Sequence, residues 1–284
     1  VGNVSNTLIK NKLDKNTILI FSSDNGASLA DRTIKDFKHY SSNKYRGSKA
    51  DLWDGGHRIP FILKWPNNHN IIPNSQSNQL ICLVDIMATF ADILNIKLPN
   101  NQGEDSHSFS PLLNISPDYQ LTPQLNRNGI IHHSFDGLFA YRTEQYKLLL
   151  CPGSGGWTHP KDNDARLAGQ PLLQLYDMSS DPTEKHNLIM SKPEIAIQLF
   201  GFLLKDIKNG RTRPLSSISE SQESYTSHKK KKKKEEEEEE ENDFISKNEV
   251  PVDIWKGLTQ WITTSDLFET VYRHPYKPGV SLLL

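Results

Sequence analysis

Cysteine is scarce in this chain of 284 residues, which contains only Cys82 and Cys151. Two cysteines are too few for a disulfide framework or for a zinc site built from cysteine thiolates. One disulfide bridge and two free thiols are both compatible with the sequence, and the sequence alone leaves these two arrangements open.

Long apolar runs are also missing. No stretch approaches the roughly 18–20 apolar residues of a membrane-spanning helix, so we predict no membrane span. The first residues contain no basic segment followed by an apolar core, so no signal peptide is recognisable. This absence does not assign a compartment, because a sequence that begins inside a longer protein would show the same pattern.

Neither sign of charge is in excess. The chain has 33 Lys and Arg against 34 Asp and Glu, and a net charge of -1 argues against a protein that coats nucleic acid. This average hides a pure lysine block, Lys229–Lys234, followed by a pure glutamate block, Glu235–Glu241. We predict that residues 214–249 are a disordered low-complexity segment, because so polar a composition cannot offset the cost of ordering the backbone.

The first part of the chain, residues 1–118, has the pattern of an α/β domain. The pattern predicts a helix at 6–15, a strand at Thr17–Ser22, a loop at 27–45, a strand at Pro60–Pro66, a helix at Leu80–Leu94 and a short helical turn at Phe109–Leu113. The apolar run of Thr17–Ser22 lacks alternation, which is typical of a parallel strand buried on both faces. Apolar residues at helical spacing predict an amphipathic helix at Leu80–Leu94.

Residues 119–213 show a different pattern of short strands separated by turn residues. The predicted strands are Gly129–Ser134, Phe139–Arg142, Tyr146–Cys151 and Gln174–Asp177. Such spacing indicates an antiparallel sheet, here in a small α+β subdomain. A helix is predicted at Pro193–Lys208, with Gly210 as its stop, and could cover the sheet. Residues 250–284 are left as a C-terminal tail.

A carboxylate and a carboxamide follow directly on the first predicted strand, as Asp24 and Asn25. Taken alone, Asp-Asn-Gly is a common turn, since Asn and Gly tolerate left-handed backbone. The position at a strand end favours a ligand site in an open α/β sheet. Both side chains offer oxygen, which suits calcium or magnesium better than zinc or copper.

A second motif contains the basic residues Arg46, Lys49 and Arg58 between glycine-permitted turns. Exposed basic residues are usually solvated surface, but Lys49 lies between Gly47 and the Gly55-Gly56 pair, a backbone arrangement that favours a geometric requirement. A lysine provides a compact point charge for an anionic oxygen. We predict that Lys49 is catalytic.

The remaining candidates are less direct. Arg58 has a structural alternative, since it joins the loop to the next strand, and it is also a candidate substrate contact. His132 and His133 are adjacent on a predicted strand, so at most one of them faces a given site. We predict them as substrate-binding residues. The Cys151–Trp157 segment is glycine-rich but lacks the lysine and spacing of a phosphate-binding loop, so Trp157 either packs beneath a turn or lines a sugar-sized pocket.

Taken in order, these motifs resemble the sulfatase family. The matching segments are Asn16–Gly26, Arg46–Lys49 with Trp53–Pro60, Asp85–Phe90, Phe139–Arg142 with Tyr146–Leu148, and Leu175–Asp177 with Asp181–Glu184 and Asn187–Leu188. The Gly153–Trp157 loop and the His132–Ser134 segment resemble a bacterial-type arylsulfatase branch that acts on sulfated sugars. The resemblance covers roughly residues 1–213, and the ordered set is more specific than any single motif.

The resemblance implies a fold, a chemistry and a set of roles. The fold would be the C-terminal part of an alkaline-phosphatase-like mixed-sheet sandwich, 1–118, with the antiparallel subdomain, 119–213. Asp24 and Asn25 would bind calcium, with magnesium as the alternative, and Lys49 would contact the sulfate ester. The family's nucleophile is a formylglycine made within a Cys/Ser-x-Pro-x-Arg motif. No such motif occurs in this sequence, so the formylglycine is expected in a missing N-terminal part.

Three functions are therefore weighed. The first is a sulfuric ester hydrolase acting on sulfate monoesters of carbohydrates or aryl compounds, with this fragment inactive alone. The second is another hydrolase of the alkaline-phosphatase superfamily, and the third is an inactive relic that binds sulfated glycans through Lys49 and Arg58. A sulfated small molecule or glycan is the expected partner and nucleic acid is not, while the oligomeric state is left open. The family as a whole implies a secreted, lysosomal or periplasmic location.

Overall fold

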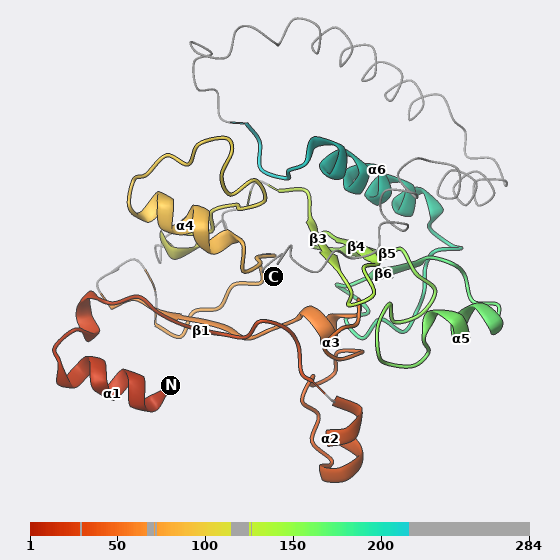
Figure 1. Cartoon of the computed structure of the whole chain (residues 1–284), viewed down its shortest axis with the longest axis horizontal. Coiled ribbons are helices and arrows are strands. Elements are labelled where there is room, and N and C mark those ends of the chain that lie inside the picture. Colours follow the sequence, from red (N-terminus) through yellow and green to blue (C-terminus); the bar gives the residue numbers. More distant parts are fainter. Residues whose placement is uncertain (29, 67–70, 72, 115–124, 126, 216–284) are drawn as a thin grey trace, which may run out of the picture. The chain divides into compact units, whose positions relative to one another are not determined.

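The computed structural model describes residues 1–28, 30–66, 71, 73–114, 125 and 127–215. The described residues form a mixed α/β structure with two antiparallel sheets, one of two strands and one of four (Figure 1). Nearly all of the predicted low-complexity segment, the whole tail and the predicted boundary between residues 118 and 119 lie outside the described residues. Among the helices of the described part, none has the length and apolar character needed to cross a membrane.

The two-stranded sheet pairs β1, Leu19–Ser22, with β2, Phe61–Lys64. It follows α1, Gly2–Lys10, and a 3₁₀ turn, η1, at Asp14–Asn16. The pairing is antiparallel, so the prediction of a parallel strand is wrong for these residues. The strand is also only partly buried, with Phe21 43% exposed. An apolar run shows that both faces of a strand are apolar, but it does not encode the direction of the strand's partner.

Residues 27–45 contain a helix where a loop was predicted. This helix, α2, spans Ala30–Phe37 and ends before Lys38, whose φ is +55°. An ion pair between Arg32 and Asp36, 3.5 Å long and one helical turn apart, supports it locally. The helix is polar and its apolar residues are few, so a search for apolar periodicity does not find it.

The helix α4, Asp85–Ile93, is shorter than predicted and buries a different face. Its buried residues are Asp85, Ala88, Thr89 and Ala91, while the apolar Met87 and Phe90 are 46% and 37% exposed. The predicted apolar face is therefore not the packed face. The polar residues are buried because they hold the segment that precedes η2, Ser110–Asn114.

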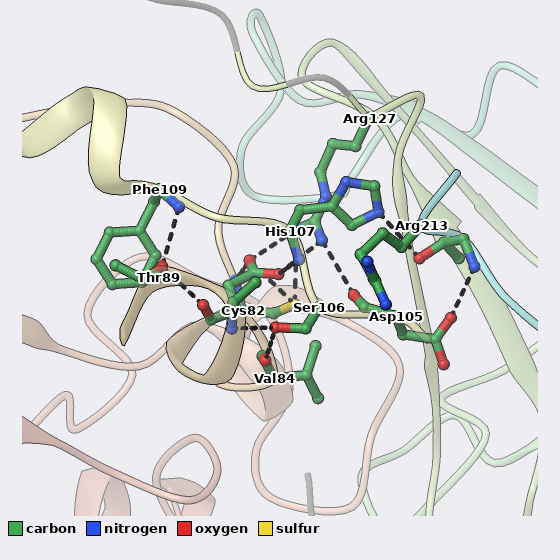
Figure 2. Close-up of polar contacts among 12 residues, drawn as sticks. Cys82, Val84, Thr89, Asp105, Ser106, His107, Phe109, Arg127 and Arg213 are labelled. Carbon is green, nitrogen blue, oxygen red and sulfur yellow. Dashed lines mark hydrogen bonds and ion pairs between the residues drawn. The ribbon is translucent and has the colours of Figure 1, made fainter. Parts of the chain in front are cut away.

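Figure 2 shows the polar contacts on this side of α4. The carboxylate of Asp85 accepts two hydrogen bonds from Arg127, of 2.7 and 2.8 Å, and one from the backbone N–H of His107, of 3.0 Å. Thr89 Oγ1 accepts a hydrogen bond from the backbone N–H of Phe109. Because backbone groups supply several of these bonds, the cluster orders the chain between α4 and η2.

Both cysteines are free thiols, which decides between the two arrangements left open by the sequence. Cys82 lies in the cluster of Figure 2, where burial and the charge of Asp85 raise the pKa of its thiol to about 12. Burial raises the pKa of the Cys151 thiol as well. Both thiols therefore stay protonated at neutral pH, a state in which they are poor nucleophiles.

The four-stranded sheet confirms the predicted antiparallel subdomain. Its strands are β3, Ile130–His133, β4, Phe139–Arg142, β5, Tyr146–Leu149, and β6, Gln174–Asp177, in the order β3-β4-β5-β6. The chain between β5 and β6 contains a short helix that was not predicted, α5, Asp162–Leu167.

Helix α6, Pro193–Asn209, packs against this sheet (Figure 1). It ends at Gly210, which has a φ of +65°, as the sequence predicts. The phenol of Tyr141 donates a hydrogen bond to Asp206, and its ring lies 6.2 Å from that of Phe202. Many of the best-buried apolar side chains among the described residues lie in this sheet, its helix and the chain leading into α3: Leu52, Trp53, Ala140, Leu148, Leu149, Leu175 and Leu203.

Candidate active site

The Asp24–Asn25 pair lies in a turn at the end of β1. The hydroxyl of Ser23 donates a 2.9 Å hydrogen bond to the backbone carbonyl of Asn25 and so closes the turn locally. The backbone N–H of Gly26 then donates a 2.8 Å hydrogen bond to the carbonyl of Gly56. A Cβ atom at Gly26 would lie 1.9 Å from the carbonyl oxygen of Gly55, so only glycine permits this contact. The turn is therefore packed directly on the Gly55-Gly56 pair.

Lys49 belongs to a tight turn, Ser48–Asp51, that we call the lysine loop. The backbone N–H of Lys49 donates a 2.9 Å hydrogen bond to the carbonyl of Ala27, two residues after Asn25. The structure thus brings together the two motifs that the sequence places 24 residues apart, counted from Asn25 to Lys49.

The carboxylate of Asp51 closes the lysine loop and is fully buried. One of its oxygens accepts the backbone N–H of Ser48 at 2.8 Å. The other accepts the backbone N–H groups of Trp157 and Thr158 at 2.8 and 3.0 Å. A carboxylate that accepts three N–H groups is well compensated for its burial. Asp51 therefore fixes the lysine loop and joins it to the glycine-rich loop of residues 153–158.

The loop continues into a one-turn helix, α3, Asp54–His57, which was not predicted. The backbone N–H of Gly55 donates a 2.7 Å hydrogen bond to the carbonyl of Arg46. A Cβ atom at Gly55 would lie 2.2 Å from the carbonyl oxygen of Gly47. The glycine pair is thus required by close backbone approach on two sides, since the turn after Asn25 packs against it from the other direction.

A buried ion cluster supports α3 from the four-stranded sheet. The ammonium of Lys147, on β5, lies 2.9 Å from Asp54 and 2.8 Å from Glu184, and its side chain is fully buried. Glu184 also accepts the backbone N–H of Asp54 at 2.6 Å, at the N-terminus of α3. The cluster thus combines an ion pair with a helix cap, so that Lys147 and Glu184 fix the position of the helix that follows the lysine loop.

The charges of this cluster shift its pKa values in consistent directions. Burial alone would lower the pKa of Lys147, but the two carboxylates outweigh it and raise this pKa. Burial alone would raise the pKa of Asp54, and the Lys147 charge lowers it instead. Burial dominates at Glu184 and raises its pKa. Lys147 therefore stays charged, and Asp54 is its ionised partner.

The structure places the two predicted arginines differently. The guanidinium of Arg46 lies 3.6 Å above the ring of Trp53 and donates a 2.8 Å hydrogen bond to the carbonyl of Glu184. The guanidinium of Arg58 lies 4.5 Å from the ring centre of Tyr45, with a 3.6 Å ion pair to Asp54. Arg46 is thus held inside the structure, whereas the side chain of Arg58 is 52% exposed and keeps solvent access.

The predicted histidines alternate, as adjacent residues on a strand must. His132 is buried, its Nε2 donates to the carbonyl of Leu52 at 3.4 Å, and its ring lies 4.2 Å from that of His57. His133 points to the other face, is half-buried, and donates a 2.9 Å hydrogen bond to the carbonyl of Ser134. Of the two predicted histidines, His133 therefore keeps the larger surface that a ligand could touch.

Burial also controls the charge of the histidine pair. It lowers the pKa of His57 to about 3 and holds the pKa of His132 well below its usual value, and the neighbouring charge of Lys147 acts in the same direction on both. Both rings are therefore neutral at physiological pH. The neutral rings, tilted by 53° to one another, provide packing between α3 and β3 rather than positive charge.

Sequence reasoning missed Asp51, Lys147 and Glu184 as supports of the site. A signal was present at Lys147, which is the one charged residue in the run Tyr146–Leu150 of an otherwise apolar strand. A lysine in that position needs a buried counter-charge. The sequence does not reveal that Asp54 and Glu184 supply it, because they lie 93 and 37 residues away along the chain.

The donors at Asp24 and Asn25 fit a hard cation but do not complete its shell. A carboxylate and a carboxamide oxygen match the ligands that calcium takes, and calcium requires six to eight oxygens in total. Within the ranges that the structure describes, no group of three or more His, Cys, Asp and Glu residues is arranged to hold a metal ion. Further ligands would have to come from elsewhere.

Comparisons with known proteins show which proteins the chain is similar to. A sequence model of the sulfatase family matches residues 1–96, which contain both motifs. The chain is 33% identical over 216 residues to an N-acetylgalactosamine-6-O-sulfatase of Bacteroides thetaiotaomicron, an alignment that covers 73% of this chain and 39% of that relative. The matched part of the chain belongs to the sulfatase family.

A further relative and two solved structures extend this result. The mouse N-acetylgalactosamine-6-sulfatase is 26% identical over 213 residues, covering 68% of this chain and 38% of the relative. A solved structure on glycosaminoglycan metabolism by Bacteroides thetaiotaomicron superimposes with a TM-score of 0.58 at 29% identity, over 73% of this chain and 42% of that one. A structure bound to a neocarrahexaose has a TM-score of 0.52, covers 77% and 42%, and at 22% identity shows the fold alone. The chain spans about two-fifths of the length of these relatives.

Proposed function

We propose that this chain supplies the cation-binding and sulfate-binding part of an enzyme that hydrolyses sulfate monoesters. The observation that carries the proposal is the hydrogen bond from the Lys49 N–H to the Ala27 carbonyl. It joins a lysine to a turn bearing two hard oxygen donors. An ammonium group near oxygen ligands for a divalent cation is the arrangement that a tetrahedral oxyanion requires.

Each residue has a separate role in this proposal. Lys49 donates its ammonium protons to a sulfate oxygen and holds the ester in place. Asp24 and Asn25 provide two oxygen ligands for calcium, with magnesium as the alternative ion. The bound cation would withdraw negative charge from the sulfate oxygens, as divalent ions do at other oxyanion sites. Asp51, Glu184 and Lys147 act only through the position of the lysine loop and of α3.

The nucleophile is not among these residues. The sequence contains no Cys/Ser-x-Pro-x-Arg motif, and the two cysteines are free thiols. We therefore expect the 284-residue chain alone to hydrolyse no sulfate ester. A carbohydrate is the proposed substrate class, in line with the relatives named after N-acetylgalactosamine 6-sulfate and with the ulvan-active sulfatase of Formosa agariphila.

The decisive test uses the product of the complete gene, expressed together with a formylglycine-generating enzyme. Hydrolysis of N-acetylgalactosamine 6-sulfate and of 4-nitrophenyl sulfate is followed with calcium and after chelation. We expect Lys49→Ala to lower kcat/KM by roughly 10²–10³-fold, the usual effect of losing one preorganised donor. Lys97→Ala, at an exposed position far along the chain, is the matched control.

Two outcomes would contradict the proposal. Preference for phosphate diesters with zinc or manganese would instead indicate another hydrolase of the alkaline-phosphatase superfamily. Retained affinity for sulfated glycans, without turnover and without dependence on calcium, would indicate a binding protein that has lost catalysis.

A further inference from the structure

Two exposed aromatic side chains lie beside the lysine loop. Phe135 is 70% exposed and Trp157 is 45% exposed, and their ring centres are 5.3 Å apart with the planes tilted by 55°. Other large aromatic residues of this part of the protein, such as Trp53 and Tyr141, are fully buried. Phe135 and Trp157 therefore form a small aromatic surface that the core does not use.

Backbone hydrogen bonds tie this aromatic pair to the residues that follow Lys49. The N–H of Phe135 donates to the carbonyl of Ala50 at 3.0 Å. The N–H of Trp157 donates to the carboxylate of Asp51 at 2.8 Å. Each aromatic residue is thus anchored within two residues of Lys49. The two aromatic residues come from different loops, since Phe135 precedes β4 and Trp157 follows β5.

The loop that carries Trp157 is fixed without help from its indole ring. The N–H of Leu52 donates to the carbonyl of Ser154 at 2.8 Å. Gly155 has a φ of +68°, and a Cβ atom at Gly156 would lie 2.3 Å from the carbonyl oxygen of Ala50. Glycine is therefore needed for the close approach of the two loops. Because backbone contacts and the carboxylates of Asp51 and Asp162 hold the loop, the indole face is available to a ligand at little cost in ordering.

We infer that Phe135 and Trp157 bind the pyranose ring of the sugar whose sulfate group contacts Lys49. This inference rests on the proposed function and adds the part of the substrate that the enzyme recognises. A pyranose presents an apolar C–H face for contact with aromatic rings, while its sulfate requires a cation nearby. A protein partner is disfavoured by size, since two rings provide far less than the roughly 800 Å² that each side of a stable interface contributes.

The experiment uses the full 284-residue chain and requires no turnover. Binding of galactose 6-sulfate, galactose and inorganic sulfate is measured by calorimetry or by ligand-observed NMR. We expect Trp157→Ala and Phe135→Ala each to weaken the binding of galactose 6-sulfate about tenfold, a common effect of removing an aromatic anchor. The binding of inorganic sulfate should be unchanged. Trp157→Tyr should retain most of the affinity for the sugar.

The control is Phe37→Ala, since Phe37 is 76% exposed on α2. Near-ultraviolet circular dichroism confirms that each variant is folded. If Trp157→Ala weakens the binding of galactose 6-sulfate and of inorganic sulfate equally, the inference is overturned, because the ring would then only support the lysine loop. Absence of galactose 6-sulfate binding at millimolar concentration, or aromatic variants that bind galactose 6-sulfate as tightly as the wild type, would also overturn it.

Lys49→Ala separates this inference from the proposed function. If this variant loses its affinity for inorganic sulfate while the aromatic variants bind galactose 6-sulfate normally, the inference about Phe135 and Trp157 fails. The sulfate-binding role proposed for Lys49 is then supported. If Lys49→Ala leaves sulfate binding unchanged, the role proposed for Lys49 fails, whatever the aromatic variants do.

Discussion

The two sheets of this protein bury their residues very differently. In the β1–β2 sheet, Phe21 and Ile62 are 43% and 61% exposed. In the four-stranded sheet, Leu148, Leu149 and Leu175 are fully buried. The exposure of α1 matches that of the first sheet, since α1 has no buried residue. Burial therefore concentrates in the four-stranded sheet and its covering helix α6.

The candidate site combines these two kinds of structure. Asp24 and Asn25 follow the exposed sheet, while Lys49 lies in a loop held by the well-buried part through Asp51, Lys147 and Glu184. The difference teaches that the lysine loop has the stronger support within the described residues. The turn that bears the two oxygen donors is held to α3 through Gly26 and to the lysine loop through the hydrogen bond between Lys49 and Ala27.

The largest expected effect comes from breaking the buried ion cluster with Lys147→Met. The change leaves Asp54 and Glu184 buried without their cation, and we expect the free energy of unfolding to fall by about 3–5 kcal/mol. Urea denaturation measures this loss. Lys97→Met, at an exposed position, should change little. A loss below about 1 kcal/mol would show that the cluster is not the main support of α3.

Gly26→Ala tests the contact between the two regions. Its Cβ would lie 1.9 Å from the Gly55 carbonyl, so the turn must shift. We expect a stability loss of about 2 kcal/mol and weaker calcium binding by calorimetry, since overpacking typically costs 1–3 kcal/mol. Gly2→Ala is the control, because a Cβ there meets nothing within 4 Å. Unchanged calcium binding in Gly26→Ala would separate the metal donors from this contact.

A pH titration sharpens the comparison at the histidine pair. The pKa of His57 is lowered to about 3 by burial, so the unfolded chain takes up a proton below about pH 6.5 and the folded chain does not. Its contribution to stability is therefore fully present above pH 6.5 and is lost as the pH falls, by about 1.4 kcal/mol for each pH unit. Glu184, with its raised pKa, contributes with the opposite sign at acidic pH.

Comparing variants isolates the contribution of His57 to the pH dependence of stability. The plot of unfolding free energy against pH, between about pH 6 and 4.5, should be shallower for His57→Gln by about 1.4 kcal/mol per unit. His39→Gln, at an exposed position, is the matched control. Identical slopes for the wild type and His57→Gln would mean that the ring takes up its proton in the folded state.

The smallest effect is expected within α6, which already covers the buried sheet. Gly201 lies inside this helix, and a Cβ there would meet nothing within 4 Å. Gly201→Ala should therefore raise the unfolding free energy by about 0.5–1 kcal/mol through helix propensity alone. Thermal unfolding measures the gain in stability. A loss of stability would mean that the added methyl group clashes with a neighbouring atom.

The sequence predicted the four-stranded sheet well because its signals are local. The bounds of β4 and β6 agree residue for residue with the prediction, and Gly210 ends α6 as expected. Each of these elements is a short apolar or amphipathic segment bounded by turn residues, so neighbours in sequence contain the whole signal. The association of the Asp24 and Lys49 motifs was also anticipated, from family resemblance rather than from periodicity.

The predictions that failed depend on partners that are distant in sequence. The direction of β1 is set by β2, and the buried face of α4 is set by hydrogen bonds to Ser106 and His107. Apolar spacing could not identify that face, because Asp85 and Thr89 are buried through polar contacts. The roles of Lys49, Asp24 and Asn25 stay predictions until binding is measured.

The long-range anchoring of the lysine loop also has a consequence for biosynthesis. The contact between Asp51 and Trp157 spans 106 residues, and that between Arg46 and Glu184 spans 138. Contacts of such separation form slowly, because the intervening chain must be closed before they stabilise anything. The ribosome synthesises Lys49 early, but the contacts that hold the lysine loop can form only after β5, β6 and Glu184 have emerged. A nascent chain interrupted before residue 184 would therefore contain the lysine but lack the contacts that hold the lysine loop and α3 in position.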